Sequence, residues 1–279
     1  MIAILGGLGA ALAWATTTLC SARASRTIGA LPTLAWVMLV GLVPAGIAAL
    51  AAGGRAPHGS SIGWLALSGF GNVAGLGLVY ASVRRGKVGV VAPIASTEGA
   101  VAAVIAIGFG EHLSPGVGAA LGAAVVGVVL AASAGGVEGR TPATAIAFAS
   151  GAALSFGVSI YATGRVSQEL SIAWAMFPAR AVGVALVTLP LVVARRLPLP
   201  ARTATPLVVV TGLAEVGGFA AYAVGARHGI AIAAVLASQF AALSALGALV
   251  LYRERLTRAQ VLGIAVIACA VAALSALRA

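Results

Sequence analysis

Charged residues are scarce in this sequence, and their scarcity indicates the solvent in which the chain folds. Only 8% of its 279 residues are charged, whereas a soluble domain has about one quarter charged residues. Aspartate is absent, and lysine occurs once, at Lys87. Together with 61% hydrophobic residues, these low counts exclude an ordinary soluble domain and indicate a chain embedded in lipid.

The sequence also lacks the residue groups on which many enzymes and metal sites depend. It contains no Gly-x-x-x-x-Gly-Lys phosphate loop, which argues against an ATP-driven motor. Its three histidines, His58, His112 and His228, lie far apart, and Cys20 and Cys269 have no ligand-type spacing. We therefore predict no catalytic residue, no metal site and no cofactor. An intramembrane enzyme stays a remote alternative.

The few charges that are present are mostly basic and give a net charge of +11. They occur singly or in short groups between apolar runs rather than in one dense patch. This distribution favours contact with anionic membrane surfaces and argues against a nucleic-acid partner.

Long apolar runs dominate the rest of the sequence. A membrane span needs about 20 mostly apolar residues, and it must be helical because lipid offers no partner for free backbone groups. We predict an all-α membrane protein with ten transmembrane helices. They cover residues 2–21, 31–52, 62–83, 87–109, 114–134, 143–163, 172–194, 206–226, 229–251 and 258–277.

The second half of the chain repeats the first half. At a shift of 143 residues, identical residues fall on each other, namely Gly69 on Gly212, Arg84 on Arg227, Gly86 on Gly229 and Glu111 on Glu254. At a shift of 142, AALAW (10–14) matches AALSF (152–156). Residues 1–136 and 143–279 are therefore predicted to be two five-helix repeats. Because five is odd, the second repeat enters the membrane inverted.

The basic residues are unequally divided between the two membrane faces. Twelve of the seventeen lie in the loops after spans 1, 3, 5, 7 and 9, and four lie on the opposite face. Ten spans place both termini on one face. The positive-inside rule predicts the twelve-residue face in the cytoplasm and both termini outside.

Three segments resemble a known family. The repeated junctions GEHLSP (110–115) and YRERLT (252–257), and the stretch YASVRRGKVGVVAPIAS (80–96), are similar to the drug/metabolite transporter superfamily, in particular its ten-helix EamA-type proteins. The resemblance covers essentially the whole chain. It implies a secondary transporter whose substrates are drawn from amino acids, amines, nucleotide-linked metabolites and drugs, often with efflux as the direction.

Three ionisable residues lie near the centres of predicted spans, where a charge is costly and normally has a partner or faces a wet cavity. They are Glu98 in span 4, Arg180 in span 7 and Glu215 in span 8. Either glutamate could bind a proton or a cationic substrate, with Arg180 as counter-charge or as a ligand for an anionic group. Alternatively, Arg180 pairs permanently with one glutamate and only fixes helix contacts.

Other residues complete the predicted site. Proline removes a helical hydrogen bond, so Pro93 and Pro178 are candidates for a gating kink or for a plain packing kink. At a shift of 143, Pro93 falls on Leu236, and we expect the break in the first copy alone. Spans 3, 4, 8 and 9 are expected to form the cavity wall, with further binding candidates at Asn72, Gln239, Tyr80 and Trp14.

Glu111 and Glu254 lie at span junctions, each shortly before the first turn of the next span. A carboxylate there can meet the positive N-terminal end of a helix. We interpret both as structural residues rather than substrate ligands.

These observations predict an inner-membrane carrier that moves a small metabolite or drug-like solute by alternating access. Efflux is the expected direction, and a proton or solute gradient is the expected driving force. The expected partners are a small-molecule substrate, the lipid bilayer and protons, with the chain as a monomer or homodimer. A membrane scaffold or a lipid-handling, flippase-like subunit is the alternative.

Overall fold

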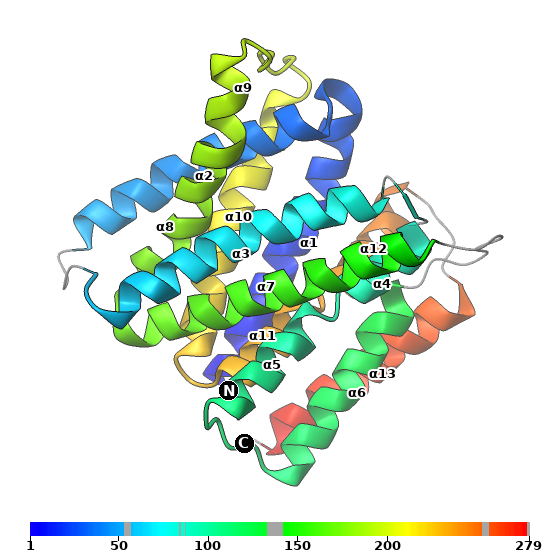
Figure 1. The fold of residues 1–279 in the computed structure, drawn as a ribbon. Coiled ribbons are helices and arrows are strands. Elements are labelled where there is room, and N and C mark those ends of the chain that lie inside the picture. Colours follow the sequence, from blue (N-terminus) through cyan, green and yellow to red (C-terminus); the bar gives the residue numbers. More distant parts are fainter. Residues whose placement is uncertain (53–56, 84, 87, 133–141, 253–256, 278–279) are drawn as a thin grey trace.

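The computed structural model describes residues 1–52, 57–83, 85–86, 88–132, 142–252 and 257–277, and their regular secondary structure is entirely helical (Figure 1). The helices of the first half are α1 (Ile2–Ile28), α2 (Ala30–Ala51), α3 (Ser60–Val83), α4 (Val88–Ala95), α5 (Glu98–Gly108) and α6 (Pro115–Ala132). The second half contains α7 (Ala143–Glu169), α8 (Ile172–Gly183), a π-helical turn η1 (Val184–Thr188), α9 (Leu189–Val193), α10 (Thr205–Ala226), α11 (Ile230–Ala237), α12 (Phe240–Tyr252) and α13 (Arg258–Leu277).

These elements form the ten predicted spans. Span 4 consists of α4 and α5, span 7 of α8, η1 and α9, and span 9 of α11 and α12. Within the described residues, eight helical stretches are long and apolar enough to cross a membrane, and shorter apolar helices cover 115–131 and 230–244. The chain is a multi-pass membrane protein, as its composition predicted. The junction between the predicted repeats, at 133–141, lies outside the described residues.

Helix packing follows the repeat: each packed pair has a counterpart in which every helix is replaced by its equivalent from the other half. Helix α1 packs along α10, and its counterpart α7 packs along α3. Helix α2 contacts α8, its equivalent in the other half, and α6 contacts its own equivalent, α13. Figure 1 shows α3 beside α7 and α6 beside α13. This is the packing that two inverted five-helix copies produce.

Both copies contain a broken helix at the same position. Helix α4 ends at Ala95 and α5 begins at Glu98, while α11 ends at Ala237 and α12 begins at Phe240. The Ser96 hydroxyl donates to the Pro93 carbonyl at 2.9 Å, and the Ser238 hydroxyl donates to the Val235 carbonyl at 2.8 Å.

The expectation of a break in the first copy alone was therefore wrong. A serine hydroxyl satisfies a carbonyl that leaves the helical ladder, so the second copy breaks without a proline. The matching breaks also fix the local shift at 142 residues, which pairs Glu98 with Phe240 rather than Ala241.

Pro178 does not interrupt its helix. Helix α8 continues past it to Gly183, and the irregular part of that span is the π-helical Val184–Thr188. The predicted kink role of Pro178 stays a prediction, and the visible irregularity begins six residues later.

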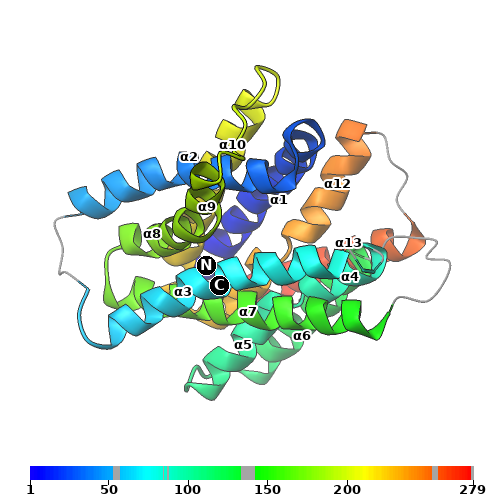
Figure 2. The ribbon, with the colours of Figure 1, turned by 45° about the horizontal axis from the view of Figure 1, so that its top comes forward.

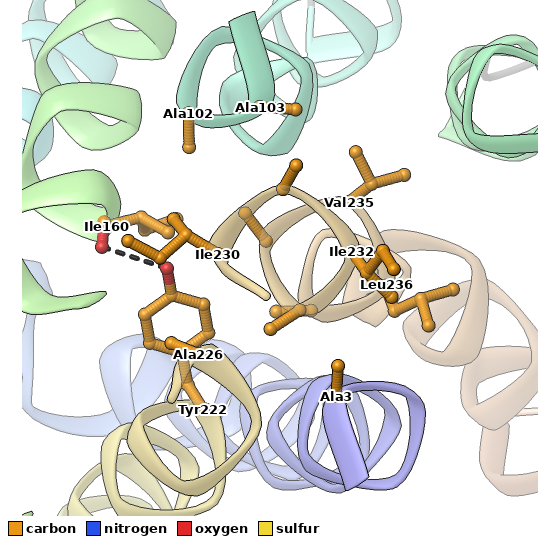
Figure 3. Close-up of a cluster of buried hydrophobic side chains, with 14 of the residues drawn as sticks. Ala3, Ala102, Ala103, Ile160, Tyr222, Ala226, Ile230, Ile232, Val235 and Leu236 are labelled. Atoms are coloured by element: carbon orange, nitrogen blue, oxygen red, sulfur yellow. Dashed lines mark hydrogen bonds between the residues drawn. The ribbon is translucent and has the colours of Figure 1, made fainter. Parts of the chain in front are cut away.

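Helix α11 forms the centre of the protein core, with all eight of its residues buried. Figure 3 shows its side chains surrounded by Ala3 of α1, Ala102 and Ala103 of α5, and Tyr222 and Ala226 of α10. A helix that is apolar on all sides can be buried completely among other helices.

The start of α1 and the end of α13 lie close to each other in both ribbon views (Figures 1 and 2), and Figure 1 shows them at the lower end of the molecule. This confirms that both termini share one face. We call this end the terminal face and the other end the opposite face.

Candidate functional site

A cavity of about 540 Å³ lies between the two halves of the protein. It extends from the helix break at Glu98 toward the opposite face, since Ser21 near the end of α1 and Gln260 near the start of α13 also line it. Its lining residues are Trp14, Thr17, Thr18, Ser21, Asn72, Leu76, Val79, Val91, Ala92, Ala95, Ser96, Glu98, Ala131, Phe156, Ser159, Ile160, Glu215, Phe219, Phe240, Ala241, Ser244 and Gln260.

Much of this lining consists of residue pairs that the repeat relates. At a shift of 142 or 143, the related pairs in the wall are Trp14 and Phe156, Thr17 and Ser159, Thr18 and Ile160, Asn72 and Glu215, Leu76 and Phe219, and Glu98 and Phe240. The cavity therefore lies on the axis between the copies, where transporters with inverted repeats place their sites. Because the paired side chains differ in charge and polarity, the site is asymmetric although the backbone is repeated.

Two glycines that the repeat relates make room for the aromatic rings of Trp14 and Phe156. A Cβ atom at Gly75 of α3 would lie 2.5 Å from the Phe156 ring, and a Cβ atom at Gly218 of α10 would overlap the Trp14 indole. Gly75 and Gly218 are themselves related by a shift of 143. In each case a helix of one copy provides the space for an aromatic wall residue of the other.

Glu98 occupies the first turn of α5 and lines the cavity with only 7% of its surface exposed. Its carboxylate makes no hydrogen bond and no ion pair with any of the residues the structure describes. Glu215, on α10, lines the same cavity. The site thus brings together two carboxylates from different copies of the repeat.

Arg180 pairs with Glu215 and not with Glu98. Its Nη2 atom lies 3.4 Å from Glu215 Oε1, and its side chain is fully buried. Its guanidinium also lies over the Phe219 ring, 5.5 Å from the ring centroid. Arg180 itself is not part of the cavity lining, so the ion pair places the glutamate, and not the arginine, at the cavity wall.

Asn72 and Trp14 contribute polar atoms that have no partner among the described residues. Asn72 Oδ1 and Trp14 Nε1 are buried without a hydrogen bond. Since buried polar atoms are normally hydrogen-bonded, orphaned atoms in a cavity wall are candidates for contact with a bound molecule. Trp14 packs against Phe219 at 5.4 Å between ring centroids and is both a core residue and a wall residue.

The remaining predicted residues lie elsewhere. Gln239 is buried in the α11–α12 break, where its Nε2 atom donates to the Val235 carbonyl at 2.9 Å. Pro93 lies in α4, three residues before Ser96, and Pro178 lies in α8; neither lines the cavity. The side chain of Tyr80 lies outside the described part of the chain.

Buried side chains close the cavity toward the terminal face. Tyr222 of α10 donates its hydroxyl to the Ile160 carbonyl at 2.9 Å, as Figure 3 shows. Beyond it, the ring of Tyr161 contacts the rings of Trp64 and Phe109, with centroids 5.7 and 5.3 Å apart.

Glu111 fastens this closed end. Its carboxylate accepts hydrogen bonds from the backbone N–H groups of Ile230 at 3.0 Å and Ala231 at 3.1 Å, at the start of α11. The predicted structural role therefore involves a helix of the other copy, whereas the sequence suggested the next span. Glu254, its repeat mate, lies outside the described residues.

Sequence reasoning missed most of the aromatic wall. Phe219 and Phe240 line the cavity but were not among the predicted site residues. Phe156 was also absent from that prediction, although the repeat relates it to the predicted Trp14. Apolar side chains in an apolar chain carry no signal of their own. The signal that could have found Phe240 was the 142-residue shift that pairs it with Glu98.

Ten helices in two inverted copies around a central cavity define a class of integral membrane protein with a pseudosymmetric site. Residues 1–133 match the family model of the EamA-like transporter family. This confirms the resemblance seen in the junction motifs. The family is one of transporters rather than enzymes.

The fold has a solved counterpart. A crystal structure titled only as that of a protein superposes with a TM-score of 0.81, covering 99% of this chain and 96% of its own, at 21% identity. At that identity the likeness concerns the fold alone. No curated protein matches the chain.

Proposed function

We propose that this protein is a secondary transporter that binds a small solute in the central cavity and carries it across the inner membrane by alternating access. The observation that carries this proposal is the position of the cavity. It lies on the axis between the two copies, is lined by repeat-related residues, and is closed toward the terminal face.

Inverted repeats support the alternating part of the mechanism. Two copies of similar sequence can exchange their conformations, and the exchange produces a second state that is closed on the other face. The broken helices α4–α5 and α11–α12 cross at their breaks, because Gly99 packs against the Ala234 carbonyl and Ser238. A rearrangement at this crossing would change access to Glu98 from both sides.

We further propose that transport is export and that a proton gradient drives it through Glu98. This carboxylate faces the cavity with no partner among the described residues, so a proton or a solute can compete for it. Glu215 is less suited to this exchange because Arg180 already holds it at 3.4 Å.

Flux measurements test this proposal. A thermal-shift screen of amino acids, amines and nucleotides on the purified protein would first select a ligand, since a molecule that binds only the folded state raises its melting temperature. With that ligand in proteoliposomes under a pH gradient, Glu98→Gln is expected to lower pH-driven flux at least tenfold. The reason is that glutamine neither ionises nor releases a proton.

Glu169→Gln is the matched control, because Glu169 lies at the end of α7, outside the cavity. It should transport like the wild type. If Glu98→Gln transports like the wild type from pH 5 to 8, the proton-site proposal is wrong. If the wild-type protein binds the ligand but never transports it, a scaffold or lipid-handling role takes the place of the carrier.

A further inference from the structure

The free charges of the cavity are of one sign. Among its described lining residues, Glu98 and Glu215 are acidic, and none is lysine, arginine or histidine. Arg180, the nearby cation, lies behind the wall with Glu215 on one side and the Phe219 ring on the other. Glu215 is paired with Arg180, so Glu98 is the cavity carboxylate that has no counter-ion among the described residues.

The hydroxyl groups of the wall add acceptors and few donors. Each wall hydroxyl donates its proton to a backbone carbonyl: Thr17 to Thr211, Thr18 to Trp14, Ser21 to Thr18, Ser96 to Pro93, Ser159 to Ser68 and Ser244 to Phe240. A hydroxyl that has donated can still accept a hydrogen bond through its lone pairs. The cavity therefore offers oxygen acceptors to a guest that brings its own N–H donors.

Aromatic rings form much of the remaining wall. Trp14 contacts Phe219 and Phe240 edge to face, with centroids 5.4 and 6.4 Å apart, and Phe156 lines the cavity from α7. Ring faces attract cations, and the attraction grows where water is excluded. The same rings also provide an apolar surface for the body of a guest.

We propose that the solute is an organic monocation: a protonated amine on an apolar or aromatic body. Its ammonium group binds beside Glu98, and its body packs against Trp14, Phe219 and Phe240. A cavity of about 540 Å³ is of the size that accepts a drug-sized molecule. Phosphate-bearing metabolites are excluded, because no free cation in the described wall could pair with their charges.

This inference rests on the proposed function in that it names the substrate class of the same site. Three soluble probes of similar size separate charge from shape: phenethylamine, 2-phenylethanol and 3-phenylpropionate, which at pH 7 are cationic, neutral and anionic. Binding to the purified full chain in detergent is measured by isothermal titration calorimetry. We expect phenethylamine to bind at least tenfold more tightly than either of the other two.

Variants assign the preference to Glu98. Glu98→Gln is expected to weaken phenethylamine binding at least tenfold while leaving 2-phenylethanol binding unchanged. Glu98→Asp, which keeps the charge, should restore part of the preference, and Glu169→Gln should retain all of it. An unchanged melting temperature establishes that each variant is folded, and a Glu98→Gln variant that fails to fold leaves Glu98→Asp and the wild-type probe series as the test.

Equal binding of the three probes, or tighter binding of 3-phenylpropionate, would overturn the proposal. A second outcome would overturn the assignment of the ammonium site to Glu98. In it, a folded Glu215 variant loses the preference for the cationic probe, whereas Glu98→Gln keeps it. These outcomes are separate from failure of transport. A cation preference without flux contradicts the carrier alone, and flux of a neutral or anionic solute contradicts the substrate class alone.

Discussion

Arg180 is the most deeply buried charged residue of the described structure, and Glu215 is its ion-pair partner. Removing a guanidinium and a carboxylate from water costs several kcal/mol per ion, and their attraction compensates only while both remain. Arg180 has no exposed side-chain surface, and its Nε and Nη1 atoms have no hydrogen-bond partner among the residues that the structure describes. The pair is therefore a structural element that determines how α8 meets α10, and it leaves Glu98 as the free carboxylate.

Breaking this pair from one side is expected to destabilise the protein. Glu215→Gln leaves a buried, uncompensated guanidinium and should lower the free energy of unfolding by about 3–5 kcal/mol. Replacing both partners, as Arg180→Met with Glu215→Gln, removes the unpaired charge and should restore most of the loss. Denaturant unfolding in detergent measures the free energy of unfolding of the wild type, of Glu215→Gln and of the double variant. If Glu215→Gln is as stable as the wild type, the ion pair does not stabilise the protein.

At the scale of the helix, caps and close contacts matter more than hydrophobicity, because all the spans are apolar. Helix α11 begins with two N–H groups that the carboxylate of Glu111 satisfies from the other copy. Such free N–H groups are expensive in an apolar surrounding. This contact fixes the start of the most buried helix and closes the terminal face.

Glu111→Ala is expected to loosen this helix start. Losing a capping acceptor costs about 0.5–2 kcal/mol, and the amides of Ile230 and Ala231 should exchange with deuterium faster than in the wild type. Hydrogen-exchange mass spectrometry of the segment containing Gly229 and Ile230 measures the effect. The matched control is Glu169→Ala, which should leave exchange there unchanged, and equal exchange in both variants would contradict the cap.

Glycine substitutions test the seats of the aromatic wall. Gly75→Ala and Gly218→Ala should displace Phe156 and Trp14, because the added methyl groups overlap those rings. Both variants are expected to lower the melting temperature and to reduce the thermal shift produced by a bound ligand. Gly77→Ala and Gly217→Ala are controls on the same two helices, where a methyl group meets nothing within 4 Å. If all four variants have the same melting temperature and the same ligand-induced thermal shift, Gly75 and Gly218 do not determine the positions of the aromatic rings.

At the scale of the molecule, the inverted repeat produces the cavity and its closure. The copies share a backbone plan, so the site lies between them. Their unequal side chains give it one free carboxylate and a ring-lined wall. The same plan places both termini on the face toward which the cavity is closed. The side of the membrane on which the termini lie therefore determines which compartment the cavity faces.

The orientation can be measured on intact cells. The charge count predicts the opposite face in the cytoplasm. In a background carrying Cys20→Ser and Cys269→Ser, a membrane-impermeant maleimide should label His112→Cys on the terminal face and spare Thr203→Cys on the opposite face. Both positions are exposed. The reverse labelling pattern would place the termini in the cytoplasm and the cavity toward the outside.

Much of the fold was predictable because it depends on local composition. Ten apolar runs specify ten helices, since lipid leaves each span only one way to satisfy its backbone. The three midspan ionisable residues also stand out in the sequence, and two of them, Glu98 and Glu215, line the cavity. Asn72 and Trp14 line it as well, whereas Gln239 does not.

The sequence by itself determined the solvent, the spans, the inverted repeat and the level of the charged residues, because each of these is a property of position along one chain. Only the tertiary structure decided that Arg180 pairs with Glu215, that Glu111 caps α11, and that Phe219 and Phe240 complete the wall. Such partners depend on which side of each helix faces inward. A change of one residue in register turns that side by about 100°, and the one-dimensional pattern of an evenly apolar helix does not record the difference.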